Sequence, residues 1–303
     1  MTRMTPATPW SSLARTAIRR CRPAALLAVA LTAAAPSARA QVVTQGSGLT
    51  AAGIQSAVDA FRLSLGPLNP NVAGSFGSGR REINWDGVPD SFSSPNALPA
   101  NFFNSNSPRG VVFSTPGTGF QVSANDGTSA AVRFGNLNPT YTAAFTTFSA
   151  QRLFTAIGSN VLDINFFIAG SSTPAFTRGF GAVFTDVDLA TSTSLQFFDA
   201  SNTLLFSGSV LPPPVGTTGS SLSFLGVSFA GSIVSRVRIT SGNVDLGGGL
   251  SDQNGNTRDA VAMDDFIYAE PITTVPEPTT LIMMAGAMTM LALVLTGRGR
   301  RRG

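Results

Sequence analysis

The chain has 303 residues, of which 43% are hydrophobic and 12% charged, with a formal net charge of +4 and a pI near 10.5. It contains no histidine and a single cysteine, Cys21, which excludes a His-based triad and a Cys/His zinc site. The 31 glycines and 19 prolines favour turns and short strands over long helices.

The basic charge belongs to the two ends of the chain. All 20 basic residues are arginine, and ten of them lie within residues 3–39 and 298–302. All 16 acidic residues lie between Asp59 and Glu277, where they face only the other ten arginines. The intervening stretch is therefore acidic and repels phosphate backbones, which excludes nucleic acid as a partner.

The N-terminus has the three parts of a secretory signal. A basic region ending at Arg22 precedes the apolar stretch Ala24–Leu31, and Ala38 and Ala40 are small residues at the positions that signal peptidase recognises. The apolar stretch is too short to span a hydrocarbon core of ~30 Å. We therefore expect residues 1–40 to be a signal peptide, cleaved after Ala40, and Cys21 to be lost with it.

The predicted mature domain, residues 41–271, opens with one helix. Ile54, Val58, Phe61 and Leu65 recur at helical spacing from Thr50 onward, and Gly66-Pro67 ends the pattern. This apolar stripe indicates a helix that packs on the main core.

Beyond the helix, short apolar runs bounded by Gly, Pro, Asn, Asp and Ser predict strands. The expected strands are Glu82–Trp85, Gly110–Ser114, Phe120–Ser123, Leu153–Ala156, Val161–Ala169, Phe180–Thr185, Ser194–Phe198, Thr203–Val210, Ser221–Phe229, Ile233–Thr240 and Ala260–Tyr268. This pattern predicts an all-β fold, a jelly-roll-like β-sandwich with one N-terminal helix.

Acidic residues cluster at three places in the strands. Glu82 and Asp86 flank an early strand, Asp186 and Asp188 end a middle strand, and Asp264-Asp265 interrupt the last one. Strict alternation separates two faces of that last strand: Val261, Met263, Asp265 and Ile267 on one, and Ala262, Asp264, Phe266 and Tyr268 on the other. Whichever of the two faces is buried, one of the two carboxylates then lies among apolar side chains.

A buried carboxylate needs an arginine, backbone N–H groups or a hard cation as its partner. Calcium is the metal that fits an oxygen-only set of ligands, and its candidate ligands are Asp86, Asp186, Asp188, Asp264 and Asp265. Salt bridges from Arg236 or Arg238, with ordinary turn chemistry, are the alternative.

A weaker calcium signal precedes the last strand. Asp252, Asn254 and Asn256 have the D-x-N-x-N spacing that opens calcium loops, and Asp259 follows. The segment departs from the EF-hand pattern, since glycine stands at its fourth position and Met263 at its twelfth. A solvated hairpin loop is the alternative.

The C-terminus, residues 272–303, has three parts in order. Val275, Pro276, Glu277 and Pro278 come first, the apolar stretch 279–297 follows, and the basic tail 298–303 ends the chain with Arg298, Arg300, Arg301 and Arg302. As a helix, the apolar stretch extends roughly 28 Å, enough to cross a membrane. The arginines should stay on the cytoplasmic side, which leaves the domain in the periplasm.

These three parts resemble the PEP-CTERM sorting signal, which a membrane exosortase recognises. The resemblance implies a Gram-negative producer of exopolysaccharide, with the chain anchored in the inner membrane before processing near Pro276-Glu277-Pro278 and then at the cell surface or outside the cell. An ordinary single-span anchor is the alternative.

The middle of the chain is similar to domains of unassigned function in other exported proteins of this class. The similar segments are 80–87, 179–188 and 263–268. The expected layout also resembles carbohydrate-binding jelly rolls, which often hold a structural calcium between an acidic residue near the first strand and another on the last.

The sequence predicts a non-enzymatic surface or matrix protein that associates with exopolysaccharide and is stabilised by calcium. Its expected partners are signal peptidase, exosortase, the membrane and polysaccharide. An Asp-dependent hydrolase or lyase is one alternative, although no carboxylate spacing favours a catalytic pair. A self-assembling structural coat protein is the other.

Overall fold

The computed structural model describes residues 41–214, 220–247, 257–273, 286–288 and 290. The predicted signal peptide, with Ala38 and Ala40, lies outside these residues, as do the motif 275–278 and the arginines 298–302. The predicted membrane helix 279–297 lies almost entirely outside them. In the described part of the chain, no helix is both long and apolar enough to span a membrane.

Twelve strands, counted over the described residues, form two antiparallel sheets that pack face to face. One sheet has seven strands in the order β1-β10-β7-β12-β5-β4, with β2 also paired to β12: β1 Gln41–Gly48, β10 Leu222–Phe229, β7 Gly179–Thr185, β12 Ala262–Ala269, β5 Phe154–Ile157, β4 Gly119–Val122 and β2 Arg80–Ile83. The other has the order β3-β6-β11-β8-β9: β3 Val111–Ser114, β6 Val161–Phe166, β11 Arg236–Thr240, β8 Ser194–Phe198 and β9 Leu204–Ser209. The prediction of an all-β sandwich is confirmed.

The five-stranded sheet is apolar on one face only. In β6, Leu162, Ile164 and Phe166 are buried, and the alternate residues are half-buried. β8 and β11 follow the same period of two, as expected for an antiparallel sheet with one face against the core and one toward solvent. The buried face meets the inner residues of β7, β10 and β12 in the main core.

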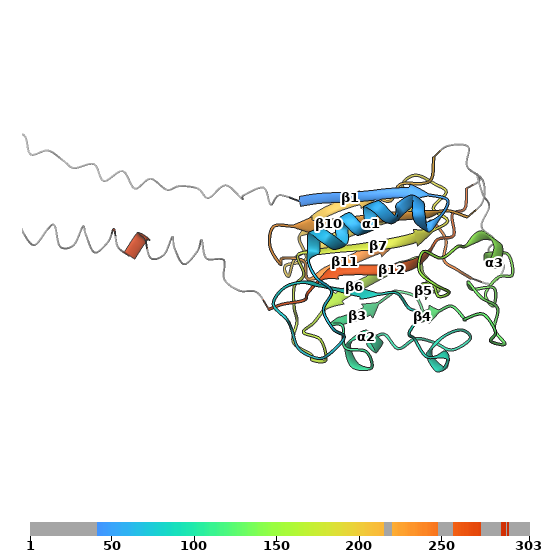
Figure 1. Ribbon diagram of the computed structural model, residues 1–303, viewed down its shortest axis with the longest axis horizontal. Helices are drawn as coiled ribbons and strands as arrows, with labels where there is room; N and C mark the ends of the chain where they lie inside the picture. The colour runs from blue at the N-terminus through green and yellow to red at the C-terminus, as the bar shows by residue number, and fades with distance from the viewer. Residues whose placement is uncertain (1–40, 215–219, 248–256, 274–285, 289, 291–303) are drawn as a thin grey trace, which may run out of the picture. The chain divides into compact units, whose positions relative to one another are not determined.

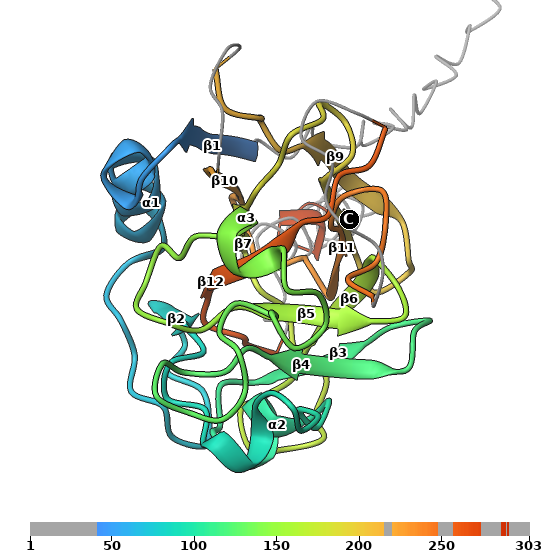
Figure 2. The ribbon, with the colours of Figure 1, turned by 90° about the vertical axis from the view of Figure 1, so that its right-hand side faces the viewer.

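The seven-stranded sheet is covered on its outer face as well. Helix α1 (Ala51–Leu65) lies across β10 and β7 (Figure 1). It buries the four predicted residues, which pack on outward side chains of the central strands such as Val183 and Ile267. Figure 2 shows α1 on one side of the sandwich and the five-stranded sheet on the other. Because both faces are covered, β7, β10 and β12 are buried along their whole length.

Three short helices lie in the described parts of the connections between strands. They are η1 (Asp90–Phe92), α2 (Phe102–Ser105) and α3 (Tyr141–Ala144). Tyr141 and Phe145 join a small apolar cluster with Ala260 and Ala262, so the segment around α3 covers the start of β12. The segment containing η1 and α2 lies beside β3 and β4 (Figure 2) and forms one wall of the site described next.

Strand β12 does not alternate strictly. Its pairing with β7 shifts register between Met263 and Phe266, which marks a β-bulge at Asp264-Asp265. Val261 and Met263 before the bulge, and Phe266 and Tyr268 after it, all face the main core. The predicted division of this strand into two faces is therefore wrong, because the extra residue reverses the alternation.

Candidate functional site

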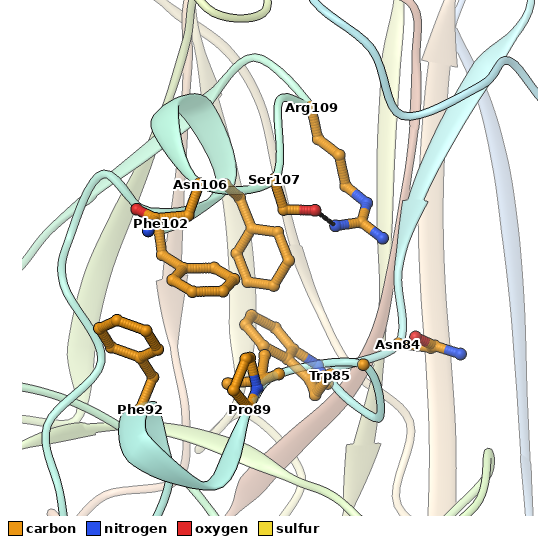
Figure 3. Close-up of a pocket in the computed structure, with 11 residues that line it drawn as sticks. Asn84, Trp85, Pro89, Phe92, Phe102, Asn106, Ser107 and Arg109 are labelled. Carbon is orange, nitrogen blue, oxygen red and sulfur yellow. Dashed lines mark hydrogen bonds between the residues drawn. The ribbon is translucent and has the colours of Figure 1, made fainter.

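Two pockets lie side by side next to β2 and share Asn84 and Arg109. The first, called the aromatic pocket, has a volume of about 300 Å³ and is lined mainly by residues 84–92 and 102–109 (Figure 3). The second, called the charged pocket, has a volume of about 380 Å³ and is lined by Arg62, Glu82 and Asp265 among others. Both volumes lie at the small end of the range for ligand sites.

Trp85 forms the floor of the aromatic pocket. It lies two residues after the end of β2 and has a φ of 67°, a left-handed conformation that costs a side chain of this size roughly 1–3 kcal/mol. Its indole stacks on Phe154 with ring centroids 4.0 Å apart, and Nε1 donates to the backbone oxygen of Asp264 at 2.8 Å. Packing therefore holds the strained residue in place.

Helices η1 and α2 supply the aromatic wall. Phe103 meets Trp85 edge to face at 5.4 Å, and Phe102 lies 5.3 Å from Phe92 of η1. Asn84 and Asn106 are exposed at the pocket and Ser107 is half-buried. Only 1–5% of Trp85, Phe102 and Phe103 is exposed, so the pocket combines the edges of packed aromatic rings with more accessible amide and hydroxyl groups.

Arg109 lies between the two pockets. Its Nη1 donates to Ser107 Oγ, and its guanidinium carbon lies 5.1 Å from the ring centroid of Phe103. Its Nε is buried and finds no acceptor among the described residues. Burial lowers the pKa of Arg109 against an opposing effect of Tyr268, and Arg81 lowers it slightly further. The guanidinium of Arg109 therefore carries its positive charge at the pockets without a carboxylate to neutralise it among the described residues.

Arg62 of α1 organises the charged pocket. It donates to both carboxylate oxygens of Glu82, at 3.1 and 2.9 Å, and to Asp265 Oδ2 at 3.1 Å. Arg80 donates to Glu82 at 2.6 Å. The buried Asp265 therefore has an arginine as its partner, which is one of the three kinds of partner expected for a buried carboxylate.

The bulge of β12 places Asp264 beside Asp265. Asp264 Oδ2 accepts the backbone N–H of Phe148 at 2.7 Å, and Oδ1 accepts the hydroxyl of Ser149 at 3.1 Å. Burial and the neighbouring Asp265 raise the pKa of Asp264 well above its ordinary value. Burial also raises the pKa of Asp265, whose Oδ1 accepts no well-formed hydrogen bond from the described donors. A proton held on Asp264 is well placed to satisfy that oxygen.

Asp86 belongs to the same neighbourhood. Its Oδ1 accepts the backbone N–H of Arg152 at 3.2 Å. Burial raises the pKa of Asp86, against the opposing effect of hydrogen bonds from Arg152 and Ser149. Because Ser149 also donates to Asp264, the structure brings together Asp86, Asp264 and Asp265 of the five candidate calcium ligands.

The other two candidates, Asp186 and Asp188, follow β7, and Asp188 is hydrogen-bonded to Asp259. Asp186 has a φ of 67°, and its N–H donates to the oxygen of Ser221 at 3.0 Å. Asp259 accepts the N–H groups of Asp188 and Leu189, at 3.1 and 3.2 Å, and the hydroxyl of Ser192. Asp259 therefore fixes the turn after β7. Residues 252–256 of the half-motif lie outside the described residues.

Two further findings bear on calcium. Over the residues that the structure describes, no group of three or more His, Cys, Asp or Glu side chains is arranged to hold a metal ion. Arg236 and Arg238, the arginines expected to neutralise the acidic clusters, instead pair with Asp163 at 2.8 Å each. Calcium binding stays a prediction.

Sequence reasoning overlooked Arg62, Arg109 and Ser149, and it also missed the residues that the segment 92–107 contributes to the aromatic pocket. Arg62 directly follows Phe61 in the apolar stripe, so it had to lie near the face of α1 that meets the sheet, and this signal was readable. No sequence signal distinguishes Arg109 from the other arginines, because its lack of a carboxylate partner is a property of the tertiary structure.

No family model matches this sequence, and no match was found among curated proteins or solved structures.

Proposed function

We propose that the chain is an exported, non-enzymatic surface or matrix protein, sorted by an exosortase, whose sandwich binds exopolysaccharide in the aromatic pocket. The C-terminal motif, apolar stretch and arginine tail support the sorting route. The observation that carries the binding function is a concave site where aromatic side chains lie beside the exposed amides of Asn84 and Asn106. A sugar ring offers apolar C–H faces and hydroxyl groups that suit such a surface.

A jelly-roll assignment is part of the proposal. Strands β5–β12 have the order β10-β7-β12-β5 in one sheet and β6-β11-β8-β9 in the other. The chain therefore crosses repeatedly between the sheets, in the manner of two Greek keys. This order supports the jelly-roll interpretation, with β1, β2, β3 and β4 as additions at the margins.

Glycan-array binding of the full-length chain in mild detergent tests the polysaccharide function. We expect binding to an exopolysaccharide fragment, weakened by Asn84→Ala and by Asn106→Ala. Gln45→Ala, at an exposed amide on edge strand β1, is the matched control and should bind normally. Absence of binding to every glycan, with and without calcium, would remove this function.

Calcium stabilisation at Asp264-Asp265 is a second part of the proposal. The Oδ1 of Asp265, which accepts no well-formed hydrogen bond from the described donors, supports it, because calcium prefers carboxylate oxygens and would replace a proton on Asp264. The donor set fits only in part, since Arg62 already contacts Asp265 Oδ2. We expect EDTA to lower the Tm of the chain, calcium to restore it, and Asp265→Asn to abolish both shifts. A Tm that ignores EDTA would exclude calcium.

An Asp-dependent hydrolase or lyase is favoured by one observation. The raised pKa of Asp264 keeps a proton donor next to the charged pocket. Turnover of exopolysaccharide that disappears in Asp86→Asn or Asp265→Asn would establish this activity in place of simple binding.

Self-assembly is favoured by another observation. Strand β1 is at one edge of the seven-stranded sheet, and its Val42 and Val43 are 59% and 42% exposed. An exposed edge strand can pair with another chain. Oligomers that form without glycan and dissociate in Val42→Lys would support a structural coat protein.

A further inference from the structure

Arg109 differs from the arginines around it. Six described arginines form ion pairs with carboxylates: Arg62, Arg80, Arg81, Arg152, Arg236 and Arg238. No carboxylate among the described residues pairs with Arg109, whose one side-chain hydrogen bond runs to the neutral Ser107. The structure therefore holds a partly buried guanidinium whose charge the described residues do not neutralise.

The neighbouring carboxylates cannot turn to Arg109 without breaking other pairs. Glu82 is held by Arg62 and Arg80, and Asp265 by Arg62. Arg81, whose charge lowers the pKa of Arg109, is itself paired with the buried Glu270. An acceptor for Arg109 has to come from outside this network.

The location of Arg109 makes such an acceptor accessible. Its side chain lines both pockets, and Figure 3 shows the guanidinium beside Ser107, with Trp85 and Asn84 across the aromatic pocket. A guanidinium has five N–H donors in a planar fork that matches a carboxylate. The Phe103 ring below it limits its orientations. Burying a guanidinium without a counter-charge costs free energy, and a bound anion offsets that cost.

We propose that Arg109 binds the carboxylate of an acidic sugar residue whose ring occupies the aromatic pocket. This inference rests on the proposed function and names its substrate class: a uronic-acid polysaccharide. Arg109 is then the residue that selects acidic over neutral sugars, while Asn84 and Asn106 contact hydroxyl groups.

The test compares uronate oligosaccharides with their methyl esters, which keep the ring and remove the charge. Galacturonate, glucuronate, mannuronate and guluronate oligomers are titrated into the full-length chain in mild detergent by calorimetry. We expect at least one acid form to bind about tenfold or more tighter than its ester. Added NaCl should weaken the acid form only.

Arg109→Gln should reduce binding of the acid form to about the level of the ester, so that the difference between the two forms disappears. Arg178→Gln is the matched control, because the Arg178 guanidinium also donates to a neutral acceptor, the backbone oxygen of Ser64, away from both pockets. Asn106→Asp is a second variant at an exposed position. It places a negative charge at the aromatic pocket and should weaken the acid form selectively even if Arg109→Gln fails to fold.

The outcomes separate this inference from the proposed function. Equal binding of acid and ester, or unchanged selectivity in both Arg109→Gln and Asn106→Asp, would overturn the role of Arg109 and leave saccharide binding intact. Binding to neutral glycans alone would do the same. Absence of binding to acidic and neutral glycans would remove both proposals together.

Discussion

Asp264 should make the stability of the protein depend on pH in an unusual direction. Its folded-state pKa lies well above the ordinary value, so the folded state binds a proton more tightly than the unfolded chain does. The stabilisation from that proton is complete below about pH 4, the pKa of an unfolded Asp, and is lost as pH rises through the folded pKa. Asp264→Asn should resemble the protonated residue. We therefore expect the Tm of the variant, relative to the parent chain, to rise between pH 4 and pH 7 in EDTA.

Asp163→Asn is the control with the opposite sign. Burial raises the pKa of Asp163, but ion pairs with Arg238 and Arg236 outweigh it and lower the pKa overall. Its stabilisation is present above pH 4 and is lost as pH falls through the lowered pKa. The cost of this substitution should shrink toward pH 3. Parallel Tm profiles for Asp264→Asn and the parent chain would contradict the raised pKa of Asp264.

At the scale of elements, Gly181 and Gly226 lie under α1 and allow the helix to reach the sheet. A Cβ atom at Gly226 would lie 2.7 Å from Phe61 and 2.9 Å from Phe224. Gly226→Ala should therefore push Phe61 out of its site and destabilise the fold by about 1–3 kcal/mol in denaturant unfolding. Gly87→Ala is the control, because nothing lies within 4 Å of its Cβ. Equal stability of the two variants would show that α1 is not held by this contact.

A buried ion pair ties the segment after α1 to the end of β12. Arg81 donates to both oxygens of Glu270, at 2.8 and 2.9 Å, and to the backbone oxygens of Pro70, Val72 and Gly74. Glu270→Gln leaves the guanidinium without its counter-charge and should cost about 3–5 kcal/mol in denaturant unfolding.

Asp59→Asn is the control for this ion pair. It removes a surface partner of Arg62 that is 58% exposed, so it should change the free energy of unfolding by less than about 1 kcal/mol. If Glu270→Gln and Asp59→Asn lowered the free energy of unfolding by similar amounts, burial would not be what makes the Arg81–Glu270 pair important.

Elements whose apolar residues follow a clear period were predictable from the sequence. Helix α1 buries the four residues of the predicted stripe, and each of the eleven predicted strands overlaps an observed one. Strand β1 was missed because Gln41–Gly48 has only two apolar residues and is held mainly by backbone pairing with β10. The faces of β12 were misassigned because a bulge leaves no mark in the alternation of residue types.

At the scale of the whole molecule, the site depends on contacts between distant segments. Arg62, Glu82 and Asp265 come from α1, β2 and β12, and Ser149 comes from the connection before β5. The sequence showed that a buried carboxylate on the last strand needs a partner, which was correct for Asp265. It could not show which arginine would serve, since pairing depends on strand order and register.

The proposed sorting signal and the folded domain should behave as independent parts. Among the described residues, the buried side chains of the three apolar clusters lie between Ile54 and Ala269, and we expect the replacement of Pro276, Glu277 and Pro278 by alanine to leave the Tm unchanged. The same variant should lose processing, because the prolines that keep this site extended and the carboxylate between them are removed.

Cell fractionation and intact mass measure the result. We expect the parent chain to be released from the inner membrane as a shortened product and the variant to stay there at full length after signal cleavage. Val275→Ala is the control and should be processed normally. A variant that is processed like the parent chain would show that the tail is an ordinary membrane anchor.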